Sequence, residues 1–260
     1  MSSSLSARTV LITGASSGIG LEAARLFAQS GAALFLVGRD PARLQRVATE
    51  TGAQAIRADL TQAEELRRVA DTVAQRSGRL DVLVNCAGRL EVGPTRELGA
   101  ATAEALMRVN FFAPVALTDA CLPLLRAGVR ASVVNVASIA GRVSPPFMAA
   151  YAASKHALVA YTRTLRQELR SEGIHVGLVL PAPVATPMLQ ASFGGPYYPR
   201  PPGLPVVTAT EAAQAILACA ERRYAERTVP RWLGGVIGLQ AAFPGLTELL
   251  YRAMGVPGRG

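Results

Sequence analysis

Lysine is almost absent from this chain. Lys155 is the only lysine among the 27 lysine and arginine residues of the 260-residue sequence. If positive charge alone mattered at this position, arginine would be the expected residue. A compact ammonium group with three donors can bridge several oxygen atoms, which a planar guanidinium does less well. The use of lysine at position 155 therefore points to a specific chemical task.

Cysteine is also scarce, and this limits the types of site and compartment that fit the chain. Cys86, Cys121 and Cys219 have neither paired nor metal-like spacing. We therefore expect no metal site and no disulfide framework, and we expect buried thiols in a reducing compartment. The first residues lack the apolar core of a signal peptide. These features favour a cytoplasmic protein.

Clusters of basic residues interleaved with aromatic residues are lacking, although the formal net charge is +9. The arginines are spread along the whole length, so we expect no nucleic-acid binding. Half of the residues are hydrophobic and 17% are charged, which excludes a disordered chain. This length is close to the upper size for one hydrophobic core, and we expect residues 1–260 to form a single domain.

Short apolar segments alternate with amphipathic segments along most of the sequence. The predicted strands cover residues 9–13, 33–37, 54–57, 80–84, 131–137, 174–180 and, at one edge, 228–232. The predicted helices follow residue 20 and cover 41–51, 62–76, 100–125, 151–171 and 208–224, the last with Thr210 as its cap. Continuous apolar strands between amphipathic helices indicate a parallel sheet covered on both faces. The predicted fold class is α/β, a doubly wound Rossmann-type sheet of about seven strands.

A glycine-rich turn joins the first predicted strand to the first predicted helix. Its sequence is Gly14-Ala-Ser-Ser-Gly-Ile-Gly20. Glycines allow a tight turn and a close approach of the backbone to a pyrophosphate at the helix N-terminus. The order of strand, turn and helix therefore predicts a dinucleotide site, at the edge where parallel strands end.

Tyr151 and Lys155 are four residues apart, so a helix places them one turn apart on the same face. A neighbouring ammonium lowers the pKa of a phenol, which starts near ~10. A tyrosine whose pKa lies closer to the working pH can transfer a proton to or from a reacting oxygen. An ordinary exposed helix face is the alternative interpretation of this spacing.

These motifs and the residues after the predicted strands resemble the short-chain dehydrogenase/reductase family, in its compact, non-extended branch. The resemblance covers roughly residues 9–186. It includes the glycine-rich turn, Asp59, Asn85-Cys-Ala-Gly88, Asn110, Ser138 and Tyr151-Ala-Ala-Ser-Lys155. The resemblance implies NAD(H)- or NADP(H)-dependent interconversion of alcohols and carbonyl compounds.

The resemblance also implies roles for individual residues. The implied catalytic roles are Tyr151 as acid/base, Ser138 as hydrogen-bond donor to the substrate oxygen, Lys155 as ligand of the nicotinamide ribose, and Asn110 as the holder of a relay water in a kinked helix. A polar side chain satisfied inside a helix is the alternative for Asn110. The implied cofactor contacts are Tyr151, Lys155, Gly14, Ser16, Ser17, Gly18, Ile19, Gly20, Arg39, Asp59, Leu60, Asn85, Ala87, Gly88, Pro181, Val184 and Thr186.

The residues after the second predicted strand bear on the choice of dinucleotide. Arg39 can pair with a 2′-phosphate, so we expect NADP(H) to be favoured over NAD(H). Asp40 could instead accept from a ribose hydroxyl, or cap the helix that begins at Pro41. Ser17 stands where some NADP-preferring relatives have a basic residue. The chain also has Pro181-Ala182 where the family usually has Pro-Gly.

The C-terminal third suggests the substrate class. Residues 182–207 correspond to the substrate lid of the family, and they carry Phe193, Tyr197 and Tyr198. We therefore expect a hydrophobic secondary alcohol and its ketone or aldehyde as substrate and product. Residues 233–260 form an apolar C-terminal extension that reads as two short helices broken at Pro244, each too short to span a bilayer.

Several alternatives stay open at this point. Packing of residues 233–260 against the pocket or a second subunit is the preferred interpretation, and contact with an anionic membrane, aided by the arginines at 222–231, is the alternative.

The resemblance implies a homodimer or homotetramer built through the helices at 100–125 and 151–171. A 3-oxoacyl thioester reductase and a non-catalytic NADP(H)-sensing protein are the alternative functions, with a membrane-peripheral scaffold as a further one. A sensor needs only the dinucleotide site, so the four implied catalytic residues argue against it.

Overall fold

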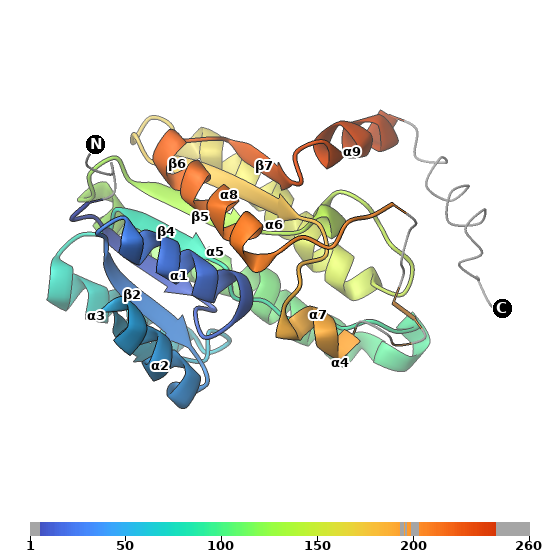
Figure 1. Ribbon diagram of the computed structural model, residues 1–260, viewed down its shortest axis with the longest axis horizontal. Coiled ribbons are helices and arrows are strands. Elements are labelled where there is room, and N and C mark those ends of the chain that lie inside the picture. Colours follow the sequence, from blue (N-terminus) through green and yellow to red (C-terminus); the bar gives the residue numbers. More distant parts are fainter. Residues whose placement is uncertain (1–5, 193–194, 196, 199–202, 243–260) are drawn as a thin grey trace.

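The structure is a computed structural model that describes residues 6–192, 195, 197–198 and 203–242. Within these residues, parallel strands form one sheet with the order β3-β2-β1-β4-β5-β6-β7 (Figure 1). The strands are β1 (Thr9–Thr13), β2 (Ala33–Gly38), β3 (Gln54–Arg57), β4 (Val82–Asn85), β5 (Ser132–Val136), β6 (His175–Pro181) and β7 (Glu226–Val229). The predicted doubly wound parallel sheet is confirmed.

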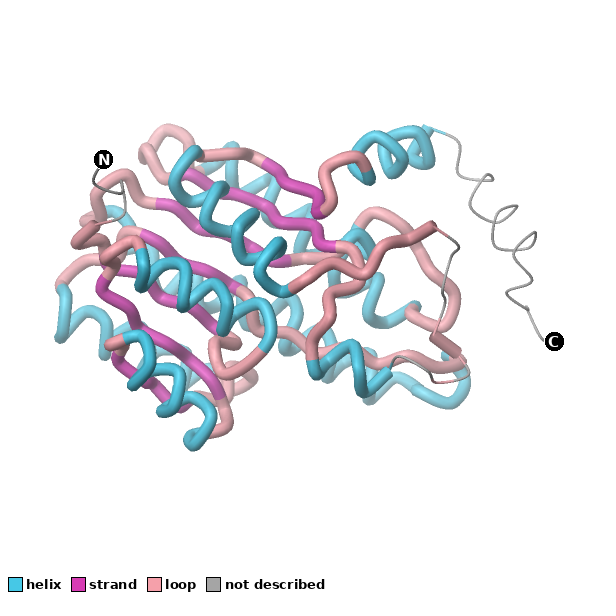
Figure 2. Tube along the Cα trace, viewed as in Figure 1, coloured by secondary structure: helices cyan, strands magenta, loops and turns pink. Residues whose placement is uncertain are grey.

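The central strands are apolar throughout because helices cover both faces of the sheet. Every residue of β1, β4 and β5 is buried. On one face lie α1 (Gly18–Gln29), α2 (Pro41–Thr51) and α8 (Ala209–Arg222), and on the other lie α3 (Ala63–Ser77), α5 (Ala113–Arg126) and α6 (Ala149–Glu168). Figure 2 shows the resulting three layers, with the strands between two sets of helices.

The strand order reverses between β1 and β4. The chain leaves β1 toward β2 and β3 on one side, and continues from β4 toward β5, β6 and β7 on the other. In an open parallel sheet, the loops at such a reversal diverge and leave a crevice at the carboxyl ends of the strands. The fold therefore places a ligand crevice next to the glycine-rich turn after β1.

The helix predicted over residues 100–125 is interrupted. α4 (Thr95–Met107) is broken at Gly99, whose backbone is not helical, so its longer part begins at Ala100 as predicted. A π-helical segment, η1 (Arg108–Phe112), separates α4 from α5. The Ala113 N–H donates to the Arg108 carbonyl, five residues earlier. Pro114 has no N–H to donate to the Asn110 carbonyl four residues before it, which favours this local widening.

Two further predictions near the C-terminus were wrong in detail. α8 is capped by Thr208, not by Thr210, because Thr208 and Glu211 form a reciprocal capping box. The last strand covers Glu226–Val229 and not residues 228–232, since Pro230 cannot continue the ladder. α9 (Leu233–Ala242) follows, with α7 (Pro187–Ser192) earlier in the chain. The predicted break at Pro244, the helix after it and Phe193 lie outside the described residues.

One helical stretch of the described residues, Thr95–Arg126, is long and apolar enough to cross a membrane by length and composition. A helix that covers a buried sheet has the same composition. Leu117, Cys121 and Leu125 of this stretch are packed into the core against the sheet and α3. The stretch is therefore accounted for as a core helix.

Candidate active site

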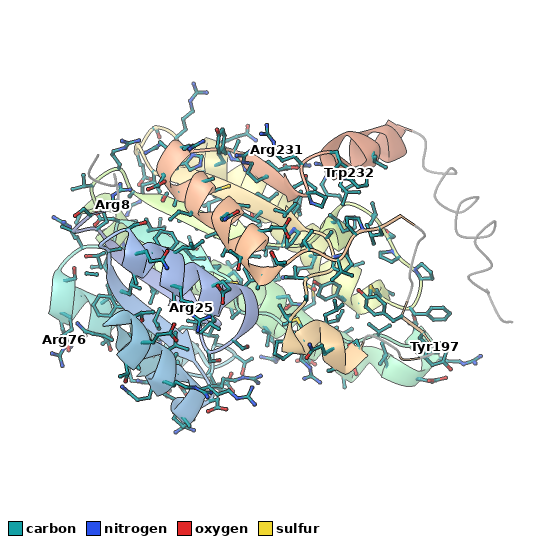
Figure 3. The ribbon with its side chains drawn as sticks, in the orientation of Figure 1. Arg8, Arg25, Arg76, Tyr197, Arg231 and Trp232 are labelled. Atoms are coloured by element: carbon teal, nitrogen blue, oxygen red, sulfur yellow. The ribbon has the colours of Figure 1, made fainter. Side chains whose placement is uncertain are left out.

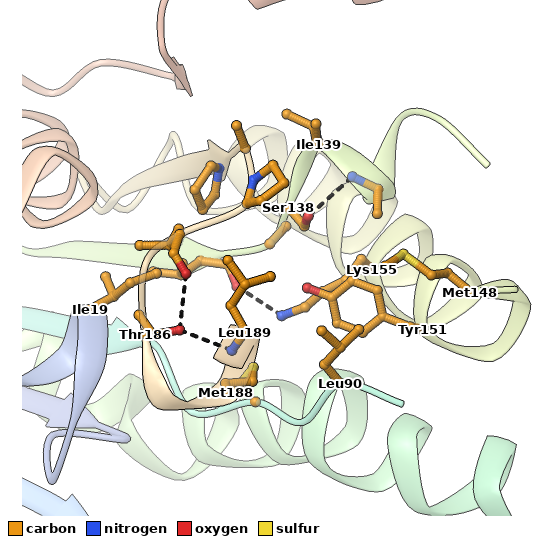
Figure 4. A pocket seen from close by; sticks show the side chains of 18 of the residues that line it. Ile19, Leu90, Ser138, Ile139, Met148, Tyr151, Lys155, Thr186, Met188 and Leu189 are labelled. Atoms are coloured by element: carbon orange, nitrogen blue, oxygen red, sulfur yellow. Dashed lines mark hydrogen bonds between the residues drawn. The ribbon is translucent and has the colours of Figure 1, made fainter. Parts of the chain in front are cut away.

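Three of the predicted catalytic side chains meet at one cavity beyond the carboxyl ends of β5 and β6. Ser138 follows β5 and caps the short helix η2 (Ile139–Gly141), where its Oγ accepts from the Ala140 N–H at 3.1 Å. Tyr151 and Lys155 project from the first turns of α6. Figure 4 shows the Tyr151 hydroxyl between Ser138 and the Lys155 ammonium. The cavity has a volume of about 150 Å³.

Lys155 is held in place by the end of β5. Its Nζ donates to the Val136 carbonyl at 3.1 Å and lies 5.9 Å from the centroid of the Tyr151 ring. The side chain is almost fully buried. Burial lowers the pKa of Lys155 to about 8, and the nearby Cys86 opposes this shift slightly. The one lysine of the chain is thus a buried amine beside the phenol.

The pKa of Tyr151 was expected to be lowered by Lys155, and this was wrong for the protein without a bound dinucleotide. Burial raises the pKa of Tyr151, and a hydrogen bond with Ser138 only partly opposes the shift. The reason is that both groups lose their hydration in the same pocket, so burial disfavours the charged form of each. At neutral pH the protein's own residues keep this phenol protonated.

Asn110 lies in η1 and is completely buried. Its Oδ1 accepts from the Arg89 N–H at 2.9 Å, and its Nδ2 donates to the Arg89 carbonyl at 2.9 Å and to Ser154 Oγ at 3.0 Å. The side chain thereby joins the loop after β4 to α6. This satisfied side chain fits the alternative interpretation given above.

Asn85 lines neither of the two cavities of the site, although the resemblance places it along the cofactor. The resemblance also implies that Asn85 braces neighbouring strands, and its side chain does so. Its Nδ2 donates to Asn135 Oδ1 at 2.8 Å and to Thr118 Oγ1 at 3.2 Å, and Asn135 in turn donates to Thr162. This buried network braces β4 and β5 against α5 and α6. The Asn85 side chain points into the protein interior because its polar partners, Asn135 and Thr118, are buried there.

A second cavity, of about 330 Å³, lies at the crevice formed by the strand reversal. It shares Ile19, Cys86, Gly88, Thr186 and Met188 with the first cavity, so the two form one continuous trough. The predicted cofactor residues that line the trough are Gly14, Ser16, Ser17, Gly18, Ile19, Gly20, Arg39, Asp59, Leu60, Ala87, Gly88, Tyr151, Lys155, Pro181, Val184 and Thr186. Sixteen of the seventeen predicted cofactor residues therefore share one surface.

The start of α1 is suited to an anionic group. Ser17 occupies the N-cap position without making a side-chain cap, and the first turn carries no acidic residue. The first N–H groups of a helix have no partner within the helix, and they attract phosphate. Gly14 has φ +68°, and an added Cβ would lie 2.8 Å from the Ala87 backbone. The turn is therefore built so that only glycine fits, and the residues present fit the pyrophosphate of a dinucleotide.

Arg39 and Asp40 differ in their surroundings. Asp40 caps α2 by accepting from the Arg43 N–H at 3.0 Å, and it pairs with the Arg43 side chain at 3.2 Å. Arg39 forms no ion pair among the described residues. It lines the trough and also a polar hollow that it shares with Arg57 and Arg68. The hydrogen bond from the Thr61 N–H lowers the pKa of Asp59, and the charge of Arg39 helps to lower it. The Asp40 carboxylate is thus engaged in the helix cap, whereas Arg39 lines the crevice.

Several residues of the site were given no role from the sequence. Thr13 Oγ1 accepts from the N–H groups of Cys86 and Ala87 at 3.0 and 3.1 Å, which fixes the loop after β4 to the end of β1. Leu90, Met148 and Met188 come from separate elements and line the first cavity. Only the folded chain brings them together. Ala182 has no positive φ, and its N–H donates to the Val229 carbonyl at 2.8 Å, so the Pro181-Ala182 departure is accommodated.

Comparisons with known proteins give a consistent result. The family model described as short chain dehydrogenase matches residues 8–195. Dehydrogenase/reductase SDR family member 7B of Danio rerio is 39% identical over 192 residues, which are 70% of this chain and 62% of that protein. The 1-deoxy-11-beta-hydroxypentalenate dehydrogenase of Streptomyces exfoliatus is 41% identical over 194 residues, 72% of this chain and 70% of that one.

A solved structure supports the same assignment. The crystal structure of a short chain dehydrogenase/reductase from Burkholderia phymatum in complex with NAD superposes with a TM-score of 0.82. It is 27% identical in sequence, and the match covers 94% of this chain and 96% of that one. The Danio rerio relative, by contrast, extends well beyond the matched part, which spans 62% of its length.

Proposed function

Because this chain belongs to the short-chain dehydrogenase/reductase family, a family of oxidoreductases, we propose that it interconverts a hydrophobic secondary alcohol and its carbonyl compound, with NADP(H) favoured. The observation that carries the proposal is the meeting of Ser138, Tyr151 and Lys155 in one cavity that continues into the trough at the start of α1. A dinucleotide bound in that trough supplies or accepts the hydride. The residues of the chain orient the substrate and transfer the proton.

Tyr151 is the proton donor in the direction of reduction. Burial raises its pKa, so the phenol is protonated at neutral pH and ready to protonate a carbonyl oxygen. Ser138 donates a hydrogen bond to the same oxygen, and this bond gains strength as negative charge develops there. The Lys155 Nζ lies 5.9 Å from the centroid of the Tyr151 ring, and its positive charge stabilises the phenolate that forms when Tyr151 gives up its proton. The protonated phenol is the form that the reduction step requires.

The cavity walls support an apolar substrate. Beyond the polar group of Ser138, Tyr151 and Lys155, the lining is mainly apolar and includes Leu90, Val143, Met148, Met188 and Leu189. A substrate that carries one reacting oxygen on a hydrophobic skeleton would leave few polar groups unpaired there. This is the support for a hydrophobic alcohol or carbonyl compound.

The preference for NADP(H) is supported by the different engagement of Arg39 and Asp40. Asp40 already accepts a backbone N–H and pairs with Arg43, whereas Arg39 lines the crevice and forms no ion pair among the described residues. The Arg39 guanidinium could form a bidentate, charge-assisted hydrogen bond with the 2′-phosphate of NADP(H). We expect a higher kcat/KM with NADPH than with NADH, and a loss of that advantage in Arg39→Ala. Equal rates with both cofactors in the wild type would refute this assignment.

The catalytic assignment is tested with Tyr151→Phe. We expect this variant to bind dinucleotide as the wild type does and to lose about three orders of magnitude in kcat, since positioned acid/base groups contribute about 10²–10⁴-fold. Tyr161→Phe is the matched control, because Tyr161 lies on the same helix but packs edge-on to Phe111. A panel of carbonyl compounds is followed at the nicotinamide absorbance. Wild-type rates in Tyr151→Phe would refute the assignment.

The alternative functions predict different outcomes of the same panel. A 3-oxoacyl thioester reductase would prefer acyl thioesters over simple ketones. A sensor would bind the dinucleotide but would turn over no member of the panel. The apolar lining close to Ser138 favours the simple hydrophobic carbonyl compounds.

We also propose that the protein is a homo-oligomer in a reducing compartment, the cytoplasm. Phe112, at the junction of α4 and α5, is 54% exposed, although large apolar side chains are usually covered. The three cysteines are unpaired. Cys121 and Cys219 are buried, and burial raises the pKa of Cys121 to about 12, which suits an inert thiol. Cys86, which was also expected to be buried, is half-buried where it lines both cavities. Light scattering of the purified chain and of Phe112→Asp tests the oligomer.

A further inference from the structure

The outer edge of the sheet carries arginines gathered around one tyrosine. Tyr224 lies in the turn before β7, and the Arg227 guanidinium stacks 4.0 Å from the centroid of its ring. A hydrogen bond from Arg222 is the main cause that lowers the pKa of Tyr224, and the charges of Arg227 and Arg231 add to it. Three guanidinium groups therefore lie close to one exposed phenol.

Exposed apolar side chains adjoin these arginines. Trp232 is 57% exposed and Val236 is 54% exposed. Leu233 and Ile237, one position further along, are buried in the core, so α9 turns one face inward and the face with Trp232 and Val236 outward. Figure 3 shows Arg231 and Trp232 beside each other at the edge of the molecule between β7 and α9.

Glu226, the acidic residue between these arginines, is engaged with two other arginines. Glu226 accepts from Arg142 at 2.5 Å and from Arg163 at 3.0 Å, so its carboxylate is already paired toward the interior of the fold. Residues 222–232 contain four arginines and no other acidic residue. The surface thus combines positive charge with exposed tyrosine, tryptophan and valine.

We propose that this surface, made of Arg222, Tyr224, Arg227, Arg231, Trp232 and Val236, docks the protein onto an anionic lipid bilayer. Arginines gain energy from the negative surface potential of such a bilayer, at short range. Tyrosine and tryptophan have an apolar ring with a polar edge, and they favour the depth of the lipid headgroups. Val236 and the Trp232 ring would enter the boundary between headgroups and acyl chains.

A second copy of the chain fits this surface less well. β7 lies at the end of the sheet, and a two-fold contact across it would face this positively charged surface with the same surface of the other copy. Like charges placed opposite each other across paired strands are destabilising. An anionic bilayer meets the same arginines with the opposite charge.

The chain offers a direct probe, because Trp232 is its only tryptophan. The full-length protein is mixed with vesicles of phosphatidylcholine, with and without phosphatidylserine, and the tryptophan emission is recorded. We expect a blue shift with the anionic vesicles alone, and its reversal at high salt. Co-sedimentation with the same vesicles gives the partition coefficient independently of enzyme activity.

The matched variants are Arg227→Glu with Arg231→Glu, and the control Arg67→Glu with Arg76→Glu on α3, where both side chains are exposed. Both pairs change the net charge equally. We expect the first pair to lower the partition coefficient about thirtyfold or more, given about tenfold for each 1.4 kcal/mol and about 1 kcal/mol per arginine. The control pair should bind nearly as the wild type does.

The proposal is overturned by any of three results. These are no blue shift with anionic vesicles, an equal loss of binding in both variant pairs, or a smaller oligomer for the first pair without vesicle binding by the wild type. The last result would identify the surface as a contact between subunits. Circular dichroism confirms that each variant is folded.

Discussion

Glu226→Gln tests how the catalytic elements are held together. Glu226 is on the edge strand β7, and its two carboxylate oxygens accept from Arg142 at 2.5 Å and from Arg163 at 3.0 Å. Arg142 directly follows η2, the helix capped by Ser138, and Arg163 lies on α6, the helix of Tyr151 and Lys155. One carboxylate therefore ties both catalytic elements to the sheet edge.

The expected magnitude follows from the burial of this cluster. The side chains of Arg142 and Glu226 are 22% and 24% exposed, and that of Arg163 is 42% exposed. A hydrogen bond to a charged partner contributes about 1.5–3 kcal/mol when sheltered, and exposed pairs contribute less than about 1 kcal/mol. We expect Glu226→Gln to lower the free energy of unfolding by about 2 kcal/mol, because one sheltered bond is weakened and one exposed pair is lost.

Urea unfolding followed by circular dichroism measures this change. The control is Glu104→Gln, which removes an exposed ion pair with Arg108 on the helix surface, and its midpoint should stay at the wild-type value. Glu226→Gln should also lower kcat more than KM changes, since Ser138 and Tyr151 lose their common support. If the two variants unfold at the same urea concentration, the carboxylate does not hold these elements together.

Two further predictions concern a half-buried histidine and the glycine-rich turn. Burial lowers the pKa of His175 from 6.5 to about 4, so the unfolded chain binds more protons between these pH values. The contribution of neutral His175 to stability should be complete above pH 6.5 and lost as the pH falls toward 4. The free energy of unfolding of His175→Gln should therefore depend less on pH over that window. An equal pH dependence in the variant and the wild type would contradict this. Gly14→Ala should abolish dinucleotide binding in calorimetry, because its Cβ would lie 2.8 Å from the Ala87 backbone. Gly52→Ala is the control, with the same φ of +68° but no atom within 4 Å of the added Cβ, and it should lose only about 1 kcal/mol of stability; similar losses of binding in both variants would show that crowding at Ala87 is unimportant.

The sequence alone was sufficient for features that depend on local pattern. The alternation of apolar and amphipathic segments predicted the parallel sheet, since strand and helix periods are set by neighbours in the chain. The turn after β1 and the spacing of Tyr151 and Lys155 predicted which side chains would face the crevice, because one turn of helix fixes that spacing. The structure brings these residues to one trough.

Tertiary structure alone decided the features that depend on distant partners and on burial. Asn85 and Asn110 use their side chains to join separate elements, and the bonded residues lie 50 and 44 positions away in the sequence. The pKa of Tyr151 rises, although Lys155 lies one helical turn away, because burial removes water from both groups. Periodicity reports which face of an element is covered, but solvation and long-range pairing are set only when the elements pack.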